Sequence, residues 1–77
     1  MSYDNIITGK IIRRLRKERF LSQEVLSGLA GIGRSHLAMI ETGSKNPNVE
    51  TLWQIANALD IRLSSLFLLI EDEIVHS

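Results

Sequence analysis

The chain contains 77 residues, with nine Lys or Arg, nine Asp or Glu, and no cysteine. This length predicts a single domain, residues 1–77, built around one apolar core. Without cysteine, the chain cannot form disulfides or thiolate metal sites. The longest unbroken apolar run, Leu66 to Ile70, is too short to span a bilayer, and no signal peptide is recognisable. We therefore expect a cytoplasmic protein with no membrane partner.

The charges are divided unevenly along the chain. Residues 1–45 contain eight Lys or Arg against four Asp or Glu, whereas residues 46–77 contain one arginine against five acidic residues. A chain with one basic half can present a positive surface to a polyanion although its net charge is zero. This asymmetry favours nucleic acid as a partner.

A first helix is predicted to begin between residues 5 and 8 and to end near Arg19. Its apolar stripe consists of Ile12 and Leu15, with Ile11 at the edge. The other side of this helix is charged. A solvated face and a phosphate-facing flank both remain open for Lys10, Arg13, Arg14 and Lys17.

Two short helices joined by a tight turn are predicted between Ser22 and Glu41. Ser22 is a good N-cap, and the apolar residues after it, Val25, Leu26, Leu29 and Ala30, recur at helical spacing. Gly31 suits a C-cap with positive φ, and Gly33 can cap the next helix. In that next helix, inward-facing Leu37 and Ile40 would turn the opposite face outward: Arg34, Ser35, Ala38 and Met39. Helices joined this closely cross steeply, as in a helix-turn-helix.

A loop from Thr42 to Asn48 precedes a fourth helix, which is predicted from Val49 to about Leu59. The apolar stripe of that helix is Leu52, Ile55, Ala56 and Leu59. Trp53 lies off the stripe and either flanks the core or joins a subunit contact.

A fifth helix is predicted from Leu63 or Ser64 to Ile74 or Val75, and residues 66–70 are apolar on every side of it. We expect the core to take Leu63, Leu66, Phe67 and Ile70. The apolar residues then left exposed are Leu68, Leu69 and Ile74. An exposed apolar patch usually marks a protein interface, and a symmetric homodimer is the commonest way to bury one. The helix at about 63–75 is therefore the predicted dimerisation element, together with Trp53.

Several spaced motifs resemble the Cro/repressor-type (XRE-like) helix-turn-helix transcriptional regulators, over residues 9 to 67. The motifs are Ser22-Gln23-Glu24, Gly31, Ile40-Glu41-Thr42-Gly43, Asn46-Pro47 and the run from Leu52 to Leu59. The stretch from Gly33 to Leu37 is similar to restriction–modification controller proteins. The chain departs from the family at Phe20, where a glycine is often found. The resemblance implies an all-α, compact five-helix bundle of the lambda-repressor-like type, with helices 2 and 3 as the helix-turn-helix.

The resemblance also implies roles for individual residues. It places a structural ion pair between Arg16 and Glu41, which would tie the first helix to the third. It predicts phosphate contacts by the N-terminus of the second helix and by the loop after the third. These residues are Ser22, Gln23, Thr42, Ser44, Lys45 and Asn46. His36, in the third helix, is predicted to contact a phosphate or to read groove shape, with an idle surface residue as the alternative.

Base contacts are predicted for the outward residues of the third helix. Arg34 can bind guanine O6 and N7 bidentately, and Ser35 can pair with any base edge. Ala38 and Met39 can touch a thymine methyl group, although Met39 could equally pack at the helix flank.

The sequence thus predicts a sequence-specific, double-stranded DNA-binding transcriptional regulator. It would act as a homodimer on a two-fold symmetric operator, and a restriction–modification controller is the finer interpretation. The alternative is an antitoxin or anti-regulator whose main ligand is another protein chain. No nucleophile–base pair, paired-carboxylate site or phosphate-cradling loop points to an enzyme, so we expect no catalytic residues. His36 and His76 have no partners at metal-ligand spacing, and no metal, cofactor or small-molecule effector is predicted.

Overall fold

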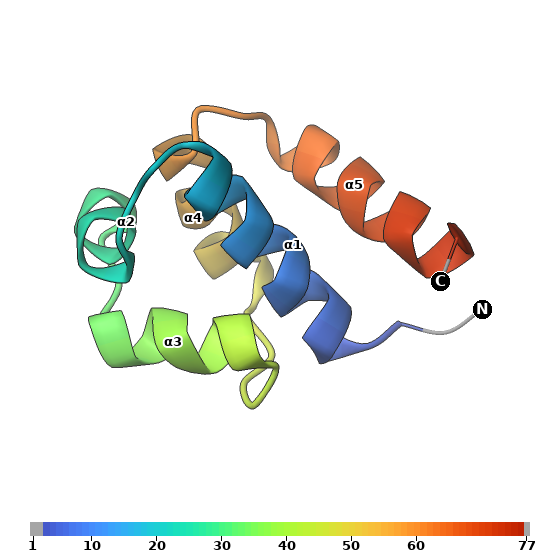
Figure 1. The fold of residues 1–77 in the computed structure, drawn as a ribbon, viewed down its shortest axis with the longest axis horizontal. Helices are drawn as coiled ribbons and strands as arrows, with labels where there is room; N and C mark the ends of the chain where they lie inside the picture. Colours follow the sequence, from blue (N-terminus) through green and yellow to red (C-terminus); the bar gives the residue numbers. More distant parts are fainter. Residues whose placement is uncertain (1–2, 77) are drawn as a thin grey trace.

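The structure, a computed structural model, describes residues 3–76, and the regular secondary structure of these residues consists of five helices (Figure 1). The helices are α1 (Asn5–Glu18), α2 (Gln23–Ala30), α3 (Arg34–Thr42), α4 (Val49–Ala58) and α5 (Leu63–His76). The predicted all-α, five-helix architecture is confirmed. None of these helices is long and apolar enough to cross a membrane.

Local side-chain chemistry fixes where the helices begin. Asp4 Oδ1 accepts from the Ile6 amide at 2.9 Å, Ser22 Oγ from Val25 at 3.1 Å, and Asn48 Oδ1 from Thr51 at 2.8 Å. These bonds satisfy backbone donors that the first turn of a helix leaves without an intrahelical partner. Gly33 caps α3 without a side-chain bond.

Glycine ends both helices of the predicted helix-turn-helix. Gly31 follows α2 at φ 73°, and Gly43 follows α3 at φ 82°. Both angles lie in the left-handed region, which glycine adopts without steric cost. Thr42, which we expected to start the loop, is instead the last residue of α3.

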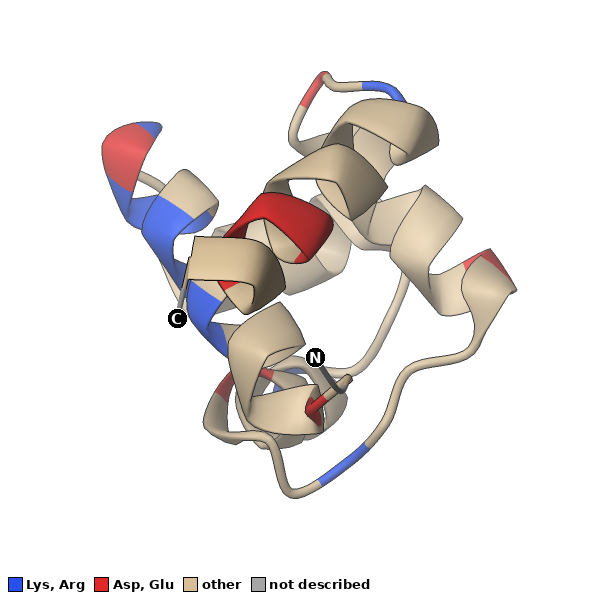
Figure 2. Cartoon of the chain, turned by 90° about the vertical axis from the view of Figure 1, so that its right-hand side faces the viewer, with Lys and Arg blue, Asp and Glu red and all other residues tan. Residues whose placement is uncertain are grey.

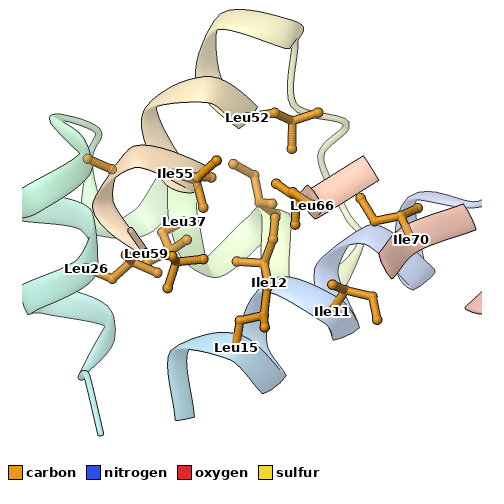
Figure 3. Packing of buried hydrophobic residues seen from close by; sticks show 13 residues of the cluster. Ile11, Ile12, Leu15, Leu26, Leu37, Leu52, Ile55, Leu59, Leu66 and Ile70 are labelled. Carbon is orange, nitrogen blue, oxygen red and sulfur yellow. The ribbon is translucent and has the colours of Figure 1, made fainter. Parts of the chain in front are cut away.

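The five helices enclose one apolar core (Figure 3). α1 packs against α3 and α5, α2 against α3 and α4, and α4 against α5. The core cluster consists of Ile11, Ile12, Leu15, Leu26, Ala30, Leu37, Ile40, Leu52, Ile55, Ala56, Leu59, Leu66 and Ile70. The stripes predicted for α1 and α4 are all part of it. Of the apolar residues predicted for α2, Leu26 and Ala30 are buried, whereas Val25 and Leu29 face outward.

The inward face of α5 differs from the prediction. Phe67, expected in the core, is 41% exposed, whereas Leu69 and Ile74, expected outside, are partly buried and pack against the core. Leu66, Ile70 and Ile74 are spaced four residues apart, so one face of the helix carries all three. The sequence does not show which face of α5 is buried, because residues 66–70 are apolar on every face.

The turn after α1 places Phe20 in an unusual conformation. Its φ is +57°, in the region that side chains with a Cβ rarely adopt, and its ring is 95% exposed. Asp60, after α4, has a similar φ of +59°. The turn at Phe20 thus has a backbone conformation that glycine usually adopts, although phenylalanine occupies the position.

Candidate nucleic-acid interface

The outer side of α3 is the candidate reading surface, and α3 runs along one edge of the molecule (Figure 1). Arg34 and Ser35, in the first turn, are exposed, and Met39 is 41% exposed. Ala38 and His36 are half-buried at the margins of this surface. Behind it, Leu37 and Ile40 are fully buried and anchor the helix in the core: Figure 3 shows Leu37 packed with Leu26 and Leu59.

A buried ion pair joins α1 to the end of α3. Arg16 Nε donates to Glu41 Oε2 at 2.7 Å, and Arg16 Nη2 donates to Glu41 Oε1 at 3.0 Å. Both residues are buried, and the remaining Arg16 nitrogen, Nη1, donates to the Leu21 carbonyl at 2.8 Å. The guanidinium thus holds three segments together: α1, the turn before α2, and α3.

Hydrogen bonding to Glu41 raises the pKa of Arg16 above the ordinary arginine value. Burial opposes this rise, and the negative charge of Glu41 adds to it. A raised pKa means that the folded state favours the charged guanidinium. The corresponding stabilisation is fully present below the ordinary arginine pKa and is lost only as pH rises through the raised pKa, so titration of Arg16 does not limit stability at any physiological pH.

Gln23 is the first residue of α2, and its side chain points toward α3. Its Nε2 donates to Glu41 Oε1 at 3.0 Å, so the same carboxylate oxygen accepts from Arg16 and from Gln23. Ser22, one residue earlier, uses its hydroxyl as the N-cap of α2. Both side chains thus make a hydrogen bond within the chain, but the Ser22 O–H and the second Nε2 N–H of Gln23 remain as donors for an anion, beside the backbone amides at the N-terminus of α2.

Four of the other predicted phosphate contacts lie at the end of α3 and in the loop that follows it, and His36 lies nearer the start of α3. The hydroxyls of Thr42 and Ser44 each donate to the Met39 carbonyl at 3.2 Å, which closes the C-terminus of α3. Lys45 and Asn46 are exposed, and Asn46 Oδ1 accepts from the Tyr3 hydroxyl at 3.3 Å. Lys45 is thus the cation that this loop presents next to α3.

The sequence analysis missed Gly9, which sets how closely α1 and α3 approach. A Cβ at Gly9 would overlap the backbone carbonyls of Ile40 and Glu41, with the Glu41 oxygen only 2.6 Å away. Only glycine therefore permits this crossing, which brings Arg16 within reach of Glu41. A glycine inside a predicted helix was the available signal, because such a residue usually has a packing reason.

Helix α1 has a basic outer side. Figure 2 shows Lys and Arg positions following one another along α1 and acidic positions on the adjoining α5. The basic side chains, all exposed, are Lys10, Arg13, Arg14 and Lys17. The charge asymmetry seen in the sequence thus corresponds to two neighbouring surfaces of the folded chain.

Comparison with known proteins identifies relatives over most of the chain. Residues 12–66 match the model of a protein family described as helix-turn-helix. The immunity repressor protein of Bacillus phage phi105 is 43% identical over 58 residues, which cover 75% of this chain and 40% of the repressor. An uncharacterized HTH-type transcriptional regulator of Sinorhizobium fredii, y4dJ, is 36% identical over 55 residues, covering 71% of each chain. The chain therefore spans less than half the length of the phage repressor.

Solved structures also resemble this chain over most of its length. The restriction–modification controller protein C.AhdI from Aeromonas hydrophila matches with a TM-score of 0.78 and 35% identity, over 80% of this chain and 94% of that chain. The wild-type controller protein C.Esp1396I matches over the full length of both chains, with a TM-score of 0.89 and 23% identity, which shows the shared fold. C.Esp1396I has also been solved bound to a 25 base pair operator site. The resemblance inferred from the motifs is thus confirmed, and the chain belongs to the helix-turn-helix family of Cro/repressor-type (XRE-like) regulators.

Proposed function

We propose that the chain is a sequence-specific, double-stranded DNA-binding transcriptional regulator that acts as a homodimer on a two-fold symmetric operator. The observation that carries this proposal is the outer side of α3. Arg34, Ser35 and Met39 project from a helix whose opposite side is fully buried and whose end is fixed by the pair between Arg16 and Glu41. A rigid helix with a polar, exposed first turn fits the major groove.

In the proposed complex, the first turn of α3 supplies the base readout. Arg34 binds guanine O6 and N7 through two parallel N–H bonds, and Ser35 pairs with a neighbouring base edge. Met39 and the half-buried Ala38 follow one turn later and contact thymine methyl groups.

Phosphate contacts on either side of α3 would set its position in the groove. Lys45 and Asn46 approach one strand from the loop after α3, with Thr42 and Ser44 beside them, and His36 approaches from nearer the start of α3. Near Ser22 and Gln23, the backbone amides of the first turn of α2 approach a phosphate, since helix N-termini bind anions. Gln23 then acts through its hydrogen bond to Glu41, which orients α2 relative to α3.

The dimer would place two copies of α3 roughly 34 Å apart, one for each successive major groove. We propose that α5 forms the subunit contact, together with Trp53 of α4. Leu68 is 57% exposed and Trp53 58% exposed, and the exposure of Phe67 adds it to this surface. Leu69 and Ile74 support the contact from the edge of the core.

The similarity to C.AhdI at 35% identity supports the finer proposal that the chain is a controller of a restriction–modification system. As a regulator of genes, it would act where the DNA is, in the bacterial cytoplasm. An operator recovered upstream of endonuclease and methyltransferase genes would support this finer proposal, and an operator elsewhere would refute it.

Selection of bound fragments from random DNA, followed by binding measurements at several salt concentrations, tests the main proposal. We expect a palindromic consensus and an affinity that falls steeply with salt because counterions are released. Arg34→Ala should relax preference at one position of each half-site at a cost of about 1–3 kcal/mol, whereas Lys45→Ala should weaken binding to all sequences and reduce the salt slope by about one. Arg14→Ala removes the same charge from the far side of α1 and is the matched control. Binding without a consensus would refute the proposal.

Sedimentation tests the dimer separately. Leu68→Glu should give monomers at concentrations at which the unchanged chain is dimeric, because a carboxylate cannot be buried without a partner. Leu29→Glu introduces the same charge at an exposed apolar position of α2 and should leave the dimer intact. A dimeric Leu68→Glu variant would place the subunit contact elsewhere.

A further inference from the structure

A groove with a volume of about 680 Å³ lies along the outer side of α1, at the edge that adjoins α5. Ile11 forms part of its floor, and Phe20 stands at the end near the α1–α2 turn. The walls are formed by four long basic side chains, Lys10, Arg13, Arg14 and Lys17. Their aliphatic stems can cover an apolar ligand while their charged ends stay at the rim.

Within residues 3–76, the four cations at this groove form no ion pair. Among residues 3–76 the only salt bridge joins Arg16 to Glu41, and these four side chains are exposed. They recur three and four residues apart, which places them on one side of α1, within the run of basic positions that Figure 2 shows along this helix. Like charges at this spacing repel one another in the isolated chain, so an anionic ligand would relieve that repulsion.

Phe20 adds two unfavourable features at the same place. Its backbone adopts a left-handed conformation, and its ring is 95% exposed to water. A residue this exposed buries almost no area against the other described residues. Residues held in sparsely populated conformations cluster at functional sites, and aromatic residues and arginine dominate the binding energy of protein interfaces.

We propose that this groove binds an acidic segment of a partner protein. Carboxylates of that segment pair with Lys10, Arg13, Arg14 and Lys17, and one of its apolar side chains packs against the ring of Phe20. The inference goes beyond the proposed function and does not depend on it, because the groove and α3 occupy different sides of α1: α3 approaches through Gly9 and Arg16.

A protein segment fits the groove better than a DNA strand does. Two carboxylates, Glu18 and Glu73, also line the groove and would repel a continuous row of phosphates. A peptide has backbone N–H groups that can donate to these carboxylates, and it can offer an apolar side chain to Phe20. The mixture of four cations, two anions and one aromatic ring thus matches an acidic, partly apolar peptide.

The test uses the full chain and a display library of random short peptides. We expect the selected peptides to be rich in Asp and Glu, to contain an aromatic or aliphatic residue, and to shift the amide NMR signals of residues 10–20. Phe20→Gly, which retains the turn geometry, should weaken their binding about tenfold, as expected for an anchor residue, and Arg14→Glu should do the same. Leu29→Ala, a truncation of another exposed apolar residue, on α2, should leave binding unchanged.

Four results would overturn the inference. One is a failure to enrich acidic peptides, and another is equal binding of the selected peptides by the Phe20→Gly variant. Loss of operator affinity on Phe20→Gly would assign the surface to DNA instead. A smaller sedimenting species for Phe20→Gly or Arg14→Glu would show that the occupant is a second copy of this chain. Operator binding is measured separately, so the failure of either proposal leaves the other standing.

Discussion

Replacing Phe20 by glycine is expected to stabilise the chain, although it removes a large apolar side chain. The left-handed conformation at φ +57° costs a residue with a Cβ about 1–2 kcal/mol. Glycine adopts this conformation freely, but its greater flexibility in the unfolded chain lowers the free energy of unfolding by about 0.4–1 kcal/mol. Because the ring is 95% exposed, its removal loses almost no buried area. The net stabilisation is about 0.5–1 kcal/mol, which corresponds to a rise in Tm of roughly 3–6 °C for a domain of this size.

Two further variants separate the backbone from the ring in urea and thermal unfolding at one fixed protein concentration. Phe20→Ala removes the ring but keeps the Cβ, so it should retain the strain and gain little. Asp60→Gly relieves a nearly identical φ of +59°, but aspartate tolerates that region, so its gain should be smaller than that of Phe20→Gly. The fixed concentration matters because dimerisation makes Tm depend on it.

The reasoning would be refuted if Phe20→Gly were no more stable than Phe20→Ala. That result would mean that the Cβ at position 20 costs nothing and that the turn holds φ +57° without strain. A loss of stability in both variants would instead show that the ring makes a stabilising contact in solution.

Two more predictions concern the frame that holds α3. Gly28→Ala should stabilise the chain by about 1 kcal/mol, because a Cβ at this helical position meets no atom within 4 Å. Gly9→Ala should destabilise the chain by about 1–3 kcal/mol, because the added Cβ would overlap backbone carbonyls of α3. Urea unfolding measures both, and equal effects would contradict the close crossing of α1 and α3. Glu41→Gln should cost about 3–5 kcal/mol by leaving Arg16 buried without an anion, whereas Glu24→Gln, at an exposed position, should stay within about 0.5 kcal/mol. A small effect of Glu41→Gln would mean that water or Gln at position 41 satisfies the guanidinium.

The features that could be predicted from the sequence are those decided by neighbouring residues along the chain. Ser22 and Asn48 cap helices because their side chains reach an amide three residues later. Gly31 ends α2 because glycine accepts the left-handed region. The stripe of α4 enters the core because its apolar residues recur at helical spacing, which indicates one buried face.

The features that could not be predicted depend on what another helix places opposite. Phe67 and Leu69 exchanged their expected positions because the apolar run of α5 gives no phase, and contact with α1 and α4 chooses the buried side. The side chain of Gln23 turns to Glu41 because that carboxylate lies beside it in the fold, 18 residues later in the chain. Gly9 matters only through the carbonyls of α3. The spacing of residues within one helix contains no information about any of these contacts.

Helix α1 connects two surfaces of the molecule: the outer side of α3, which it helps to position, and the basic groove on its own outer side. Its inner side lets α3 approach at Gly9 and holds Glu41 through Arg16, so the orientation of α3 depends on α1. Its outer side holds the unpaired cations beside Phe20. The groove borders the side of α1 that faces α3 rather than lying opposite it, because Arg13 is one helical turn from both Gly9 and Arg16. A ligand in the groove would therefore lie beside α1 residues that position α3, and the buried pair is the direct link between the two surfaces.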